Sequence, residues 1–86
     1  MTNVRILYFA SLREKVGRQA EEIELPPGVA TVAALRSHLR NRGGVYQDAF
    51  SEKALLRAAV NQDMVQPAAA IKAGDEVAFF PPVTGG

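Results

Sequence analysis

The first hydrophobic stretch of the chain, residues 4–10, is short and rich in β-branched and aromatic side chains, which predicts a β-strand. Its apolar residues alternate between two faces, with Val4, Ile6 and Tyr8 on one and Leu7 and Phe9 on the other. A strand that is apolar on both faces is either buried on both or keeps one face for a partner.

A second stretch, residues 20–25, alternates between polar and apolar positions and predicts a half-buried strand with Ile23 and Leu25 facing inward. Before it, Gly17 closes a charged turn over residues 13–16, so the two strands would form an opening hairpin. The Pro-Pro-Gly sequence that follows ends the second strand, because proline cannot donate a ladder hydrogen bond.

Residues 32–42 predict an amphipathic helix, with Thr31 as its N-cap and the glycine pair at 43–44 as its stop. The side chains on its buried stripe are Val32, Leu35 and Leu39. Around Tyr46 and Phe50 the pattern predicts no more than a short helical turn under the sheet.

Two more strands complete the pattern: residues 55–61 and, after a turn at 72–75, residues 76–80. In the first of these strands, the residues that share a face are Leu56, Ala58 and Val60. The order strand, strand, helix, strand, strand predicts an α+β domain in which one main helix covers one face of a mixed β-sheet. The first and last strands would lie parallel at the centre, with the helix in the crossover, which is the β-grasp arrangement.

The 86 residues predict a single domain over residues 1–80 and an extended C-terminal tail over residues 81–86. The ten basic and nine acidic residues are scattered, so nucleic acid is not an expected partner. The lack of cysteine excludes disulfides and thiolate metal sites. No apolar run approaches the ~20 residues that cross a bilayer, so we expect a cytoplasmic protein with no membrane partner.

Side chains that could catalyse a reaction are scarce. His38 is the only histidine, and nothing near it in the sequence would orient it as a base. The carboxylates of Glu21, Glu22 and Glu24 fit a solvated strand surface better than a metal site. We therefore expect this chain alone to bind no metal or cofactor.

The C-terminus is the remaining candidate for chemistry. Gly85 and Gly86 carry no Cβ atom, so they can enter a slit too narrow for other residues. Pro81 and Pro82 favour an extended path away from the last strand, so residues 81–86 could project ~20 Å. The terminal carboxylate needs activation. Because the chain has no nucleotide-binding motif, a separate enzyme would use ATP to adenylate it, and attack by sulfur would then give a thiocarboxylate.

Residues 74–86 read Gly-Asp-Glu-Val-Ala-Phe-Phe-Pro-Pro-Val-Thr-Gly-Gly and resemble the C-terminal signature of the small subunit of molybdopterin synthase. Residues 4–14, 31–36 and 58–62 resemble that family's first strand and turn, helix and third strand, so the resemblance spans the chain. It implies a ubiquitin-like β-grasp fold and a sulfur carrier in molybdenum cofactor biosynthesis.

The resemblance also implies partners. A ubiquitin-activating-like adenylyltransferase would adenylate Gly86, which is then converted to a thiocarboxylate (1-thioglycine). Sulfur would pass to cyclic pyranopterin monophosphate and form the molybdopterin dithiolene, with two carrier turnovers per product. The carrier would bind the large subunit of molybdopterin synthase in a heterotetramer. The tail residues inserted into that subunit would be Pro81, Pro82, Val83, Thr84 and Gly85.

If Val77 and Phe79 face the helix, alternation exposes an apolar patch on the other face, beside the tail. This tail-root patch, suited to docking a partner, consists of Leu7, Phe9, Ala78 and Phe80, beside Ala59. Arg13 is a further candidate contact: it could bind the activating enzyme or only solubilise a turn.

Three alternatives stay open. The first is a carrier of the same fold that serves thiamine synthesis or tRNA thiolation, although the Phe-Phe-Pro-Pro-Val-Thr lead-in favours the molybdopterin member. The second is a protein modifier attached through Gly86 to target lysines. The third is a binding module whose tail is inert.

Overall fold

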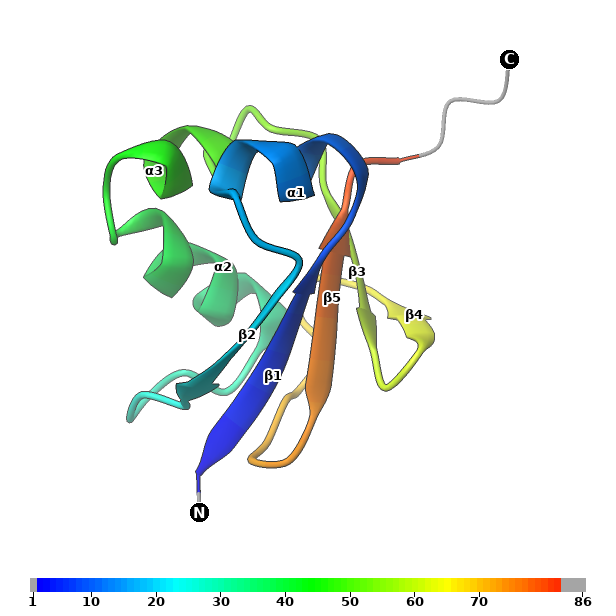
Figure 1. Ribbon diagram of the computed structural model, residues 1–86. Coiled ribbons are helices and arrows are strands. Elements are labelled where there is room, and N and C mark those ends of the chain that lie inside the picture. The colour runs from blue at the N-terminus through cyan, green and yellow to red at the C-terminus, as the bar shows by residue number, and fades with distance from the viewer. Residues whose placement is uncertain (1, 83–86) are drawn as a thin grey trace.

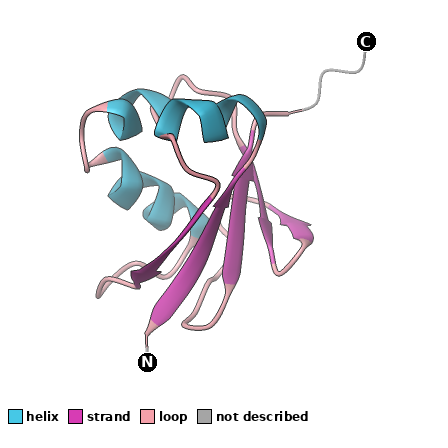
Figure 2. Ribbon diagram, viewed as in Figure 1, coloured by secondary structure: helices cyan, strands magenta, loops and turns pink. Residues whose placement is uncertain are grey.

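Residues 2–82, which the computed structural model describes, form five strands and three helices (Figure 1). The strands are β1 (Asn3–Tyr8), β2 (Ala20–Glu24), β3 (Arg57–Val60), β4 (Asp63–Val65) and β5 (Glu76–Phe80). The helices are α1 (Ala10–Val16), α2 (Val32–Arg40) and α3 (Val45–Ala49). The helices lie together on one side of a mixed sheet with the strand order β2-β1-β5-β3-β4 (Figure 2). No helix in this part of the chain is long and apolar enough to cross a membrane.

The first and last strands, β1 and β5, run parallel at the centre of the sheet, where Ile6 pairs with Val77 and Tyr8 with Phe79. β2 pairs antiparallel with β1, and β3 pairs antiparallel with β5. The predicted α+β order and the parallel central pair are therefore confirmed. The predicted boundaries of these strands and of α2 differ from the observed ones by no more than two residues.

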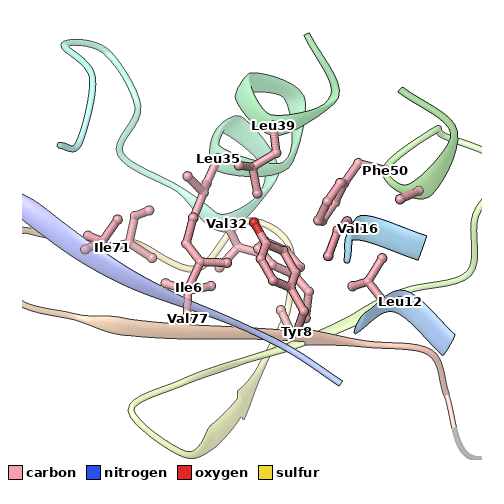
Figure 3. Close-up of a cluster of buried hydrophobic side chains, with 14 residues drawn as sticks. Ile6, Tyr8, Leu12, Val16, Val32, Leu35, Leu39, Phe50, Ile71 and Val77 are labelled. Carbon is pink, nitrogen blue, oxygen red and sulfur yellow. The ribbon is translucent and has the colours of Figure 1, made fainter. Parts of the chain in front are cut away.

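The core lies between the sheet and α2 (Figure 3). The nearly fully buried strand residues are Val4, Ile6 and Tyr8 of β1 and Val77 and Phe79 of β5. The α2 residues buried with them are the predicted stripe, Val32, Leu35 and Leu39. Phe50, directly after α3, meets the rings of Tyr8 and Phe79 edge-on, with ring centroids 6.0 and 5.3 Å apart. α3 is thus the predicted short helical turn, and its aromatic neighbour helps to close the core.

α1 occupies the segment that the sequence analysis predicted as a charged turn. Leu12 and Val16 lie four residues apart and are buried together, while Arg13 to Lys15 between them are exposed. Gly17 ends the helix at φ 79°, and its amide donates to the carbonyl oxygen of Arg13. α1 was therefore not predicted as a helix, and together with α3 it helps the predicted main helix, α2, to cover the sheet.

β4 was also missed, because its hairpin loop lacks the usual sequence. Val60 of β3 pairs with Asp63 of β4, and between them Asn61 and Gln62 have φ of 51° and 74°. Both values are positive, as in a type I′ turn, which favours Asn-Gly rather than Asn-Gln. A three-residue strand after such a loop carries no recognisable signal.

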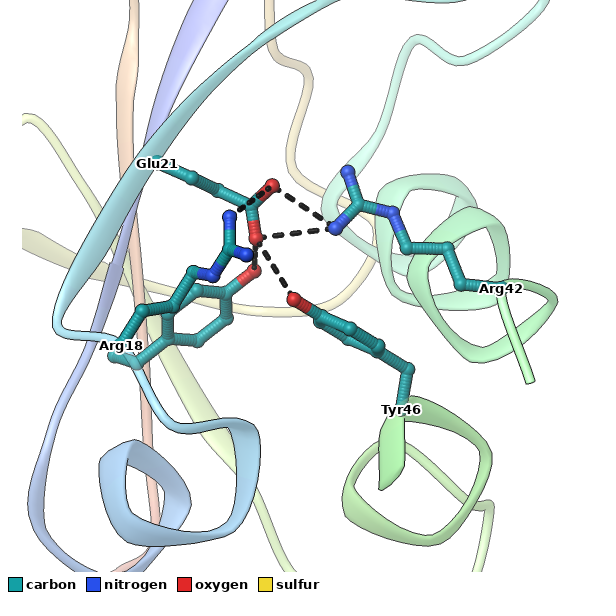
Figure 4. A network of polar contacts seen from close by, with 5 residues as sticks. Arg18, Glu21, Arg42 and Tyr46 are labelled. Carbon is teal, nitrogen blue, oxygen red and sulfur yellow. Dashed lines mark hydrogen bonds and ion pairs between the residues drawn. The ribbon is translucent and has the colours of Figure 1, made fainter. Parts of the chain in front are cut away.

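Glu21 on β2 is the centre of a polar network (Figure 4). It lies opposite Ile6 in the ladder, so its side chain points to the core side of the sheet and is only 9% exposed. Its carboxylate accepts hydrogen bonds from the Tyr8 hydroxyl at 2.7 Å and Nη1 of Arg42 at 2.9 Å, with Tyr46 Oη at 3.3 Å and Arg18 Nη1 at 3.6 Å. The prediction of a solvated surface was wrong for Glu21, although Glu22 and Glu24 are exposed as expected.

The network controls the ionisation of its members. Burial alone would raise the pKa of Glu21, but hydrogen bonds from Tyr8 and Arg42 and the positive charges of Arg42 and Arg18 outweigh burial and lower it. Burial and the hydrogen bond to Glu21 raise the pKa of Tyr8 far above its ordinary value, so its hydroxyl stays a donor. The ionised carboxylate thus joins edge strand β2 to the segment that links α2 and α3.

We expect Glu21→Gln to lower the free energy of unfolding by about 1–3 kcal/mol at pH 7, because Tyr8 and Arg42 lose a charged acceptor. Glu24→Gln changes an exposed carboxylate on the same strand and should cost less than about 0.5 kcal/mol. The folded pKa of Glu21 is below its ordinary 4.5, so its stabilisation is complete above that pH and lost as the pH falls through the folded pKa. Urea titrations across this range should show a steeper loss for the wild type than for Glu21→Gln; equal slopes would contradict the assignment.

Gln62→Gly should raise the free energy of unfolding by about 0.5–1 kcal/mol, because glycine adopts a positive φ without the strain imposed on glutamine. Gln66→Gly, at an exposed position outside the left-handed region, is the control and should be neutral or destabilising. Thermal unfolding of both variants checks this, and equal effects would show that the loop is unstrained.

Candidate functional site

The site predicted from the sequence is the C-terminal tail, and the structure describes its root. β5 ends at Phe80, and Pro81 and Pro82, both half-buried, continue beyond it. Figure 1 shows the chain leaving the end of this central strand near the start of α1. The other predicted tail residues, Val83, Thr84, Gly85 and the reactive Gly86, lie outside the described residues. Because β5 is paired with β1 and β3, the exit point of the tail is fixed.

The acidic turn of the C-terminal motif anchors the opposite end of β5. The buried carboxylate of Asp75 accepts hydrogen bonds from Asn61 Nδ2 at 3.0 Å and from the Lys72 amide at 2.9 Å. The bond from Asn61 is the main cause of a lowered pKa at Asp75, and the contacts with Lys72 add to it against the effect of burial. Asn61 Oδ1 also accepts from the Glu76 amide at 3.0 Å. The turn therefore fixes where β5 begins and, through it, where the tail starts.

The tail-root patch lies on the face of the sheet opposite the core. Leu7 and Ala78 pair across β1 and β5, and Ala78 pairs with Ala59 across β5 and β3. Phe80 is the next residue on this face of β5, and Phe9, 46% exposed, directly follows β1. Ala59 is only 8% exposed but is not part of the core cluster. The structure thus brings together the apolar side chains predicted for a partner interface.

This apolar row continues onto β4 through a residue that the sequence analysis missed. Met64 pairs with Ala59 and is 59% exposed. Nothing in the sequence indicated that Met64 belongs to this face, because β4 was not predicted and a single methionine among polar residues shows no periodicity. With Met64, the apolar row reaches the edge of the sheet.

Charged residues cluster on the outer face at the end of the sheet that is farther from the tail. Arg5, two residues before Leu7 on β1, lies opposite Glu22 on β2 and Glu76 on β5. Opposite charges in facing positions favour the sheet and keep this end hydrated. The outer face therefore has an apolar row at the tail root, with exposed Arg57 at its edge opposite Phe80, and a charged end at the start of β1 and β5.

A groove of about 520 Å³ lies between α2 and the strands β3 and β4, and we call it the α2–β4 groove. The buried side chains among its lining are Val32, Ala58 and Phe79. Its exposed edge includes Leu55 and Met64, and Pro82 of the tail root also lines it. The tail root therefore borders both the tail-root patch and this groove.

The remaining candidates offer little chemistry. Arg13 is exposed on α1 rather than in a turn, and its contact with an activating enzyme stays a prediction. His38 is half-buried on α2. Within residues 2–82, no cluster of histidine and carboxylate side chains could hold a metal ion.

Comparisons with known proteins identify the group to which this architecture belongs. The model of the ThiS family matches residues 6–86. The molybdopterin synthase sulfur carrier subunit of Haemophilus influenzae is 45% identical over 83 residues, which cover 96% of this chain and 99% of that protein.

Solved structures show the same fold. A protein described as molybdopterin converting factor subunit 1 from Pyrococcus furiosus is 34% identical, with a TM-score of 0.76 over 96% of this chain and 100% of that one. Small archaeal modifier protein 1 of Haloferax volcanii has a TM-score of 0.74 at 24% identity, over 96% and 100% of the two chains. A chain in the complex of subunits 1 and 2 of molybdopterin-converting factor from Helicobacter pylori has a TM-score of 0.64 at 19% identity, over 98% and 99%. The last two support the fold alone, but the family match and the close relative go further: this chain belongs to the ThiS family and, within it, to the molybdopterin synthase sulfur carrier subunits.

Proposed function

We propose that this chain carries sulfur as a thiocarboxylate on Gly86 and delivers it to a pterin precursor bound by the large subunit of molybdopterin synthase. The main support is the position of the tail root, which leaves a fixed central strand beside an apolar patch. The terminal Gly85-Gly86 pair, which has no side chains, is separated from that strand by the four residues 81–84. A rigid domain that presents such a tail suits delivery of its terminal group into another protein's pocket.

Charging the tail takes two steps. The carboxylate of Gly86 attacks the α-phosphate of ATP on a ubiquitin-activating-like enzyme, which gives a glycyl adenylate and releases pyrophosphate. Hydrosulfide then displaces AMP and leaves a thiocarboxylate. If the sulfur arrives as a persulfide, a thiol must supply the two electrons that cleave the sulfur–sulfur bond. In both cases, this chain supplies only the acyl group.

Discharge restores the carrier. The thiocarboxylate sulfur bonds to a carbon of the cyclic pyranopterin precursor as the bond from that carbon to an oxygen substituent breaks and the oxygen leaves with a proton. Water then cleaves the bond between that sulfur and the acyl carbon. The sulfur stays on the precursor, and Gly86 regains its carboxylate. A dithiolene contains two sulfurs, so each product needs two charged carriers.

The large subunit would dock on the tail-root patch while Pro81 to Gly85 enter its active site. Leu7 and Phe80 would lose their solvent contact, which favours association through burial of apolar surface. The Helicobacter pylori neighbour comes from a complex of subunits 1 and 2, which is consistent with such a partner. The heterotetramer, with a central dimer of large subunits and a carrier at each end, and the cytoplasmic location both stay predictions.

Removing Gly86, or adding an alanine after it, should abolish thiocarboxylate formation, because the reacting carboxylate is displaced or its access blocked. The control is an extra alanine at the N-terminus, far from the tail, which should be charged normally. Intact-mass and C-terminal fragment spectra, recorded after incubation with the activating enzyme, ATP and sulfide, would detect the exchange of one oxygen for sulfur. Normal dithiolene production by an untrimmed extended variant would refute the proposal, and a ladder of lysine conjugates in cells would indicate a modifier.

Phe80→Ala should weaken binding to the large subunit by about tenfold or more, because a central aromatic anchor of the patch is lost. Val45→Ala shortens an exposed apolar side chain on α3, away from the patch, and should leave the affinity unchanged. Calorimetric titration measures both affinities, and circular dichroism checks that both variants are folded. A folded Phe80→Ala protein with wild-type affinity would exclude the patch as the docking surface.

A further inference from the structure

The α2–β4 groove is a second surface beside the tail root that the proposed docking on the outer face does not use. It opens on the core side of the sheet, where Ala58 of β3 and Val65 of β4 face α2. The core residues Val32 and Phe79 also line it, so the bottom of the groove is apolar. A bulky apolar side chain could therefore enter it and lose its contact with water.

The rim of the groove carries two of the most exposed apolar side chains in residues 2–82. Leu55 is 77% exposed and Met64 is 59% exposed. Leu55 is held in place by its own loop: Arg36 of α2 donates hydrogen bonds to the carbonyl oxygens of Phe50, Ser51 and Ala54. Exposed apolar side chains beside an apolar groove are typical of a surface that a partner covers.

The charged residues that line the groove indicate which charge a binding segment should carry. Arg36 and Arg40 of α2 line it, with a single carboxylate among the lining residues, that of Glu52. Arg57 of β3 also borders it, but Arg57 lies opposite Phe80 and so belongs to the outer face of the sheet. Glu52 lies 3.5 Å from Arg40, and its own side chain is largely in solvent. The pKa of Arg36 is lowered by burial and by the charge of Arg40. The lining therefore favours a segment that carries carboxylates around an apolar anchor.

The groove is continuous with the tail root. Pro82 is one of its lining residues, and Met64 belongs both to its rim and to the apolar row on the outer face. A protein that receives the tail and covers the tail-root patch thus needs only to pass the short edge strand β4 to reach the groove.

We propose that the α2–β4 groove is a docking site for an acidic segment of the large synthase subunit that carries a bulky apolar side chain. The large subunit would then contact β4 on both faces of the sheet. This inference rests on the proposed function, in which the large subunit receives the tail. The segment places its apolar side chain between Leu55 and Met64 and its carboxylates near Arg40.

The test is a titration of the large subunit with Leu55→Asp and Arg40→Glu. Each variant should weaken binding by about tenfold or more, and the loss for Arg40→Glu should shrink at high salt. Val45→Asp and Lys15→Glu are the matched controls, because they make comparable changes, apolar to acidic and basic to acidic, at exposed positions on α3 and α1, and both should bind like the wild type. Circular dichroism shows that each protein is folded.

The outcomes separate the two proposals. If the wild type binds the large subunit but both groove variants bind equally well, the groove is not part of the interface and the carrier function stands. If the groove variants lose affinity for the activating enzyme and not for the large subunit, the assigned partner is wrong. If the wild type forms no thiocarboxylate and binds no large subunit, the carrier function itself fails.

Discussion

The parallel pairing of β1 with β5 at the centre of the sheet is the constraint on which the rest of this structure depends. It places Ile6 beside Val77 on the inner face, where they meet α2, and Leu7 beside Ala78 on the outer face. Two apolar faces thus follow from one register, because side chains alternate along both strands. A one-residue slip of β5 would exchange these faces and leave Phe79 in solvent. The register also decides where the tail leaves the domain.

The pairing is held at both ends by groups outside the two strands. At the start of β5, Asp75 and Asn61 fix the turn by hydrogen bonds to each other and to the backbone of Lys72 and Glu76. At the end of β1, the Phe9 amide donates to the Phe79 carbonyl oxygen at 3.2 Å. Buried polar groups that are satisfied in this way specify one arrangement rather than many. Hydrogen bonds, as well as packing, therefore fix the position of the tail root.

Most of this fold could be predicted from the sequence because its central elements have clear periodicity. β1, β5 and the stripe of Val32, Leu35 and Leu39 on α2 belong to this group. α1 was missed because only Leu12 and Val16 mark its buried side, too few for a helical pattern to stand out from a turn. β4 was missed because an Asn-Gln loop at positive φ is an exception that sequence rules do not anticipate.

Some parts of the candidate site could likewise be predicted from the sequence, and others could not. The tail and the tail-root patch depend on chain order and strand alternation, which a sequence displays directly. The α2–β4 groove depends on how far α2 leaves β3 and β4 uncovered, which is a property of packing in three dimensions. Glu21 had one visible signal, since it shares the inward parity of Ile23, but its partners Tyr8 and Arg42 come from distant segments. Long-range polar contacts of this kind have no local pattern.

The division of the outer face constrains how a partner can approach. Arg5 faces Glu22 and Glu76 across the sheet, and these charged residues keep the end far from the tail hydrated. A partner that covered them would have to remove water from the charges and would gain little favourable interaction. Near the tail, the apolar row at Leu7 can be covered at a lower cost, because the one charged residue facing it there, Arg57 opposite Phe80, lies at its edge. A partner that maximises buried apolar area therefore favours the end from which the tail emerges, which under the proposed function would orient the carrier before its last residues enter a pocket. The same asymmetry would serve any protein that charges or discharges the tail, because each must hold the same end of the domain.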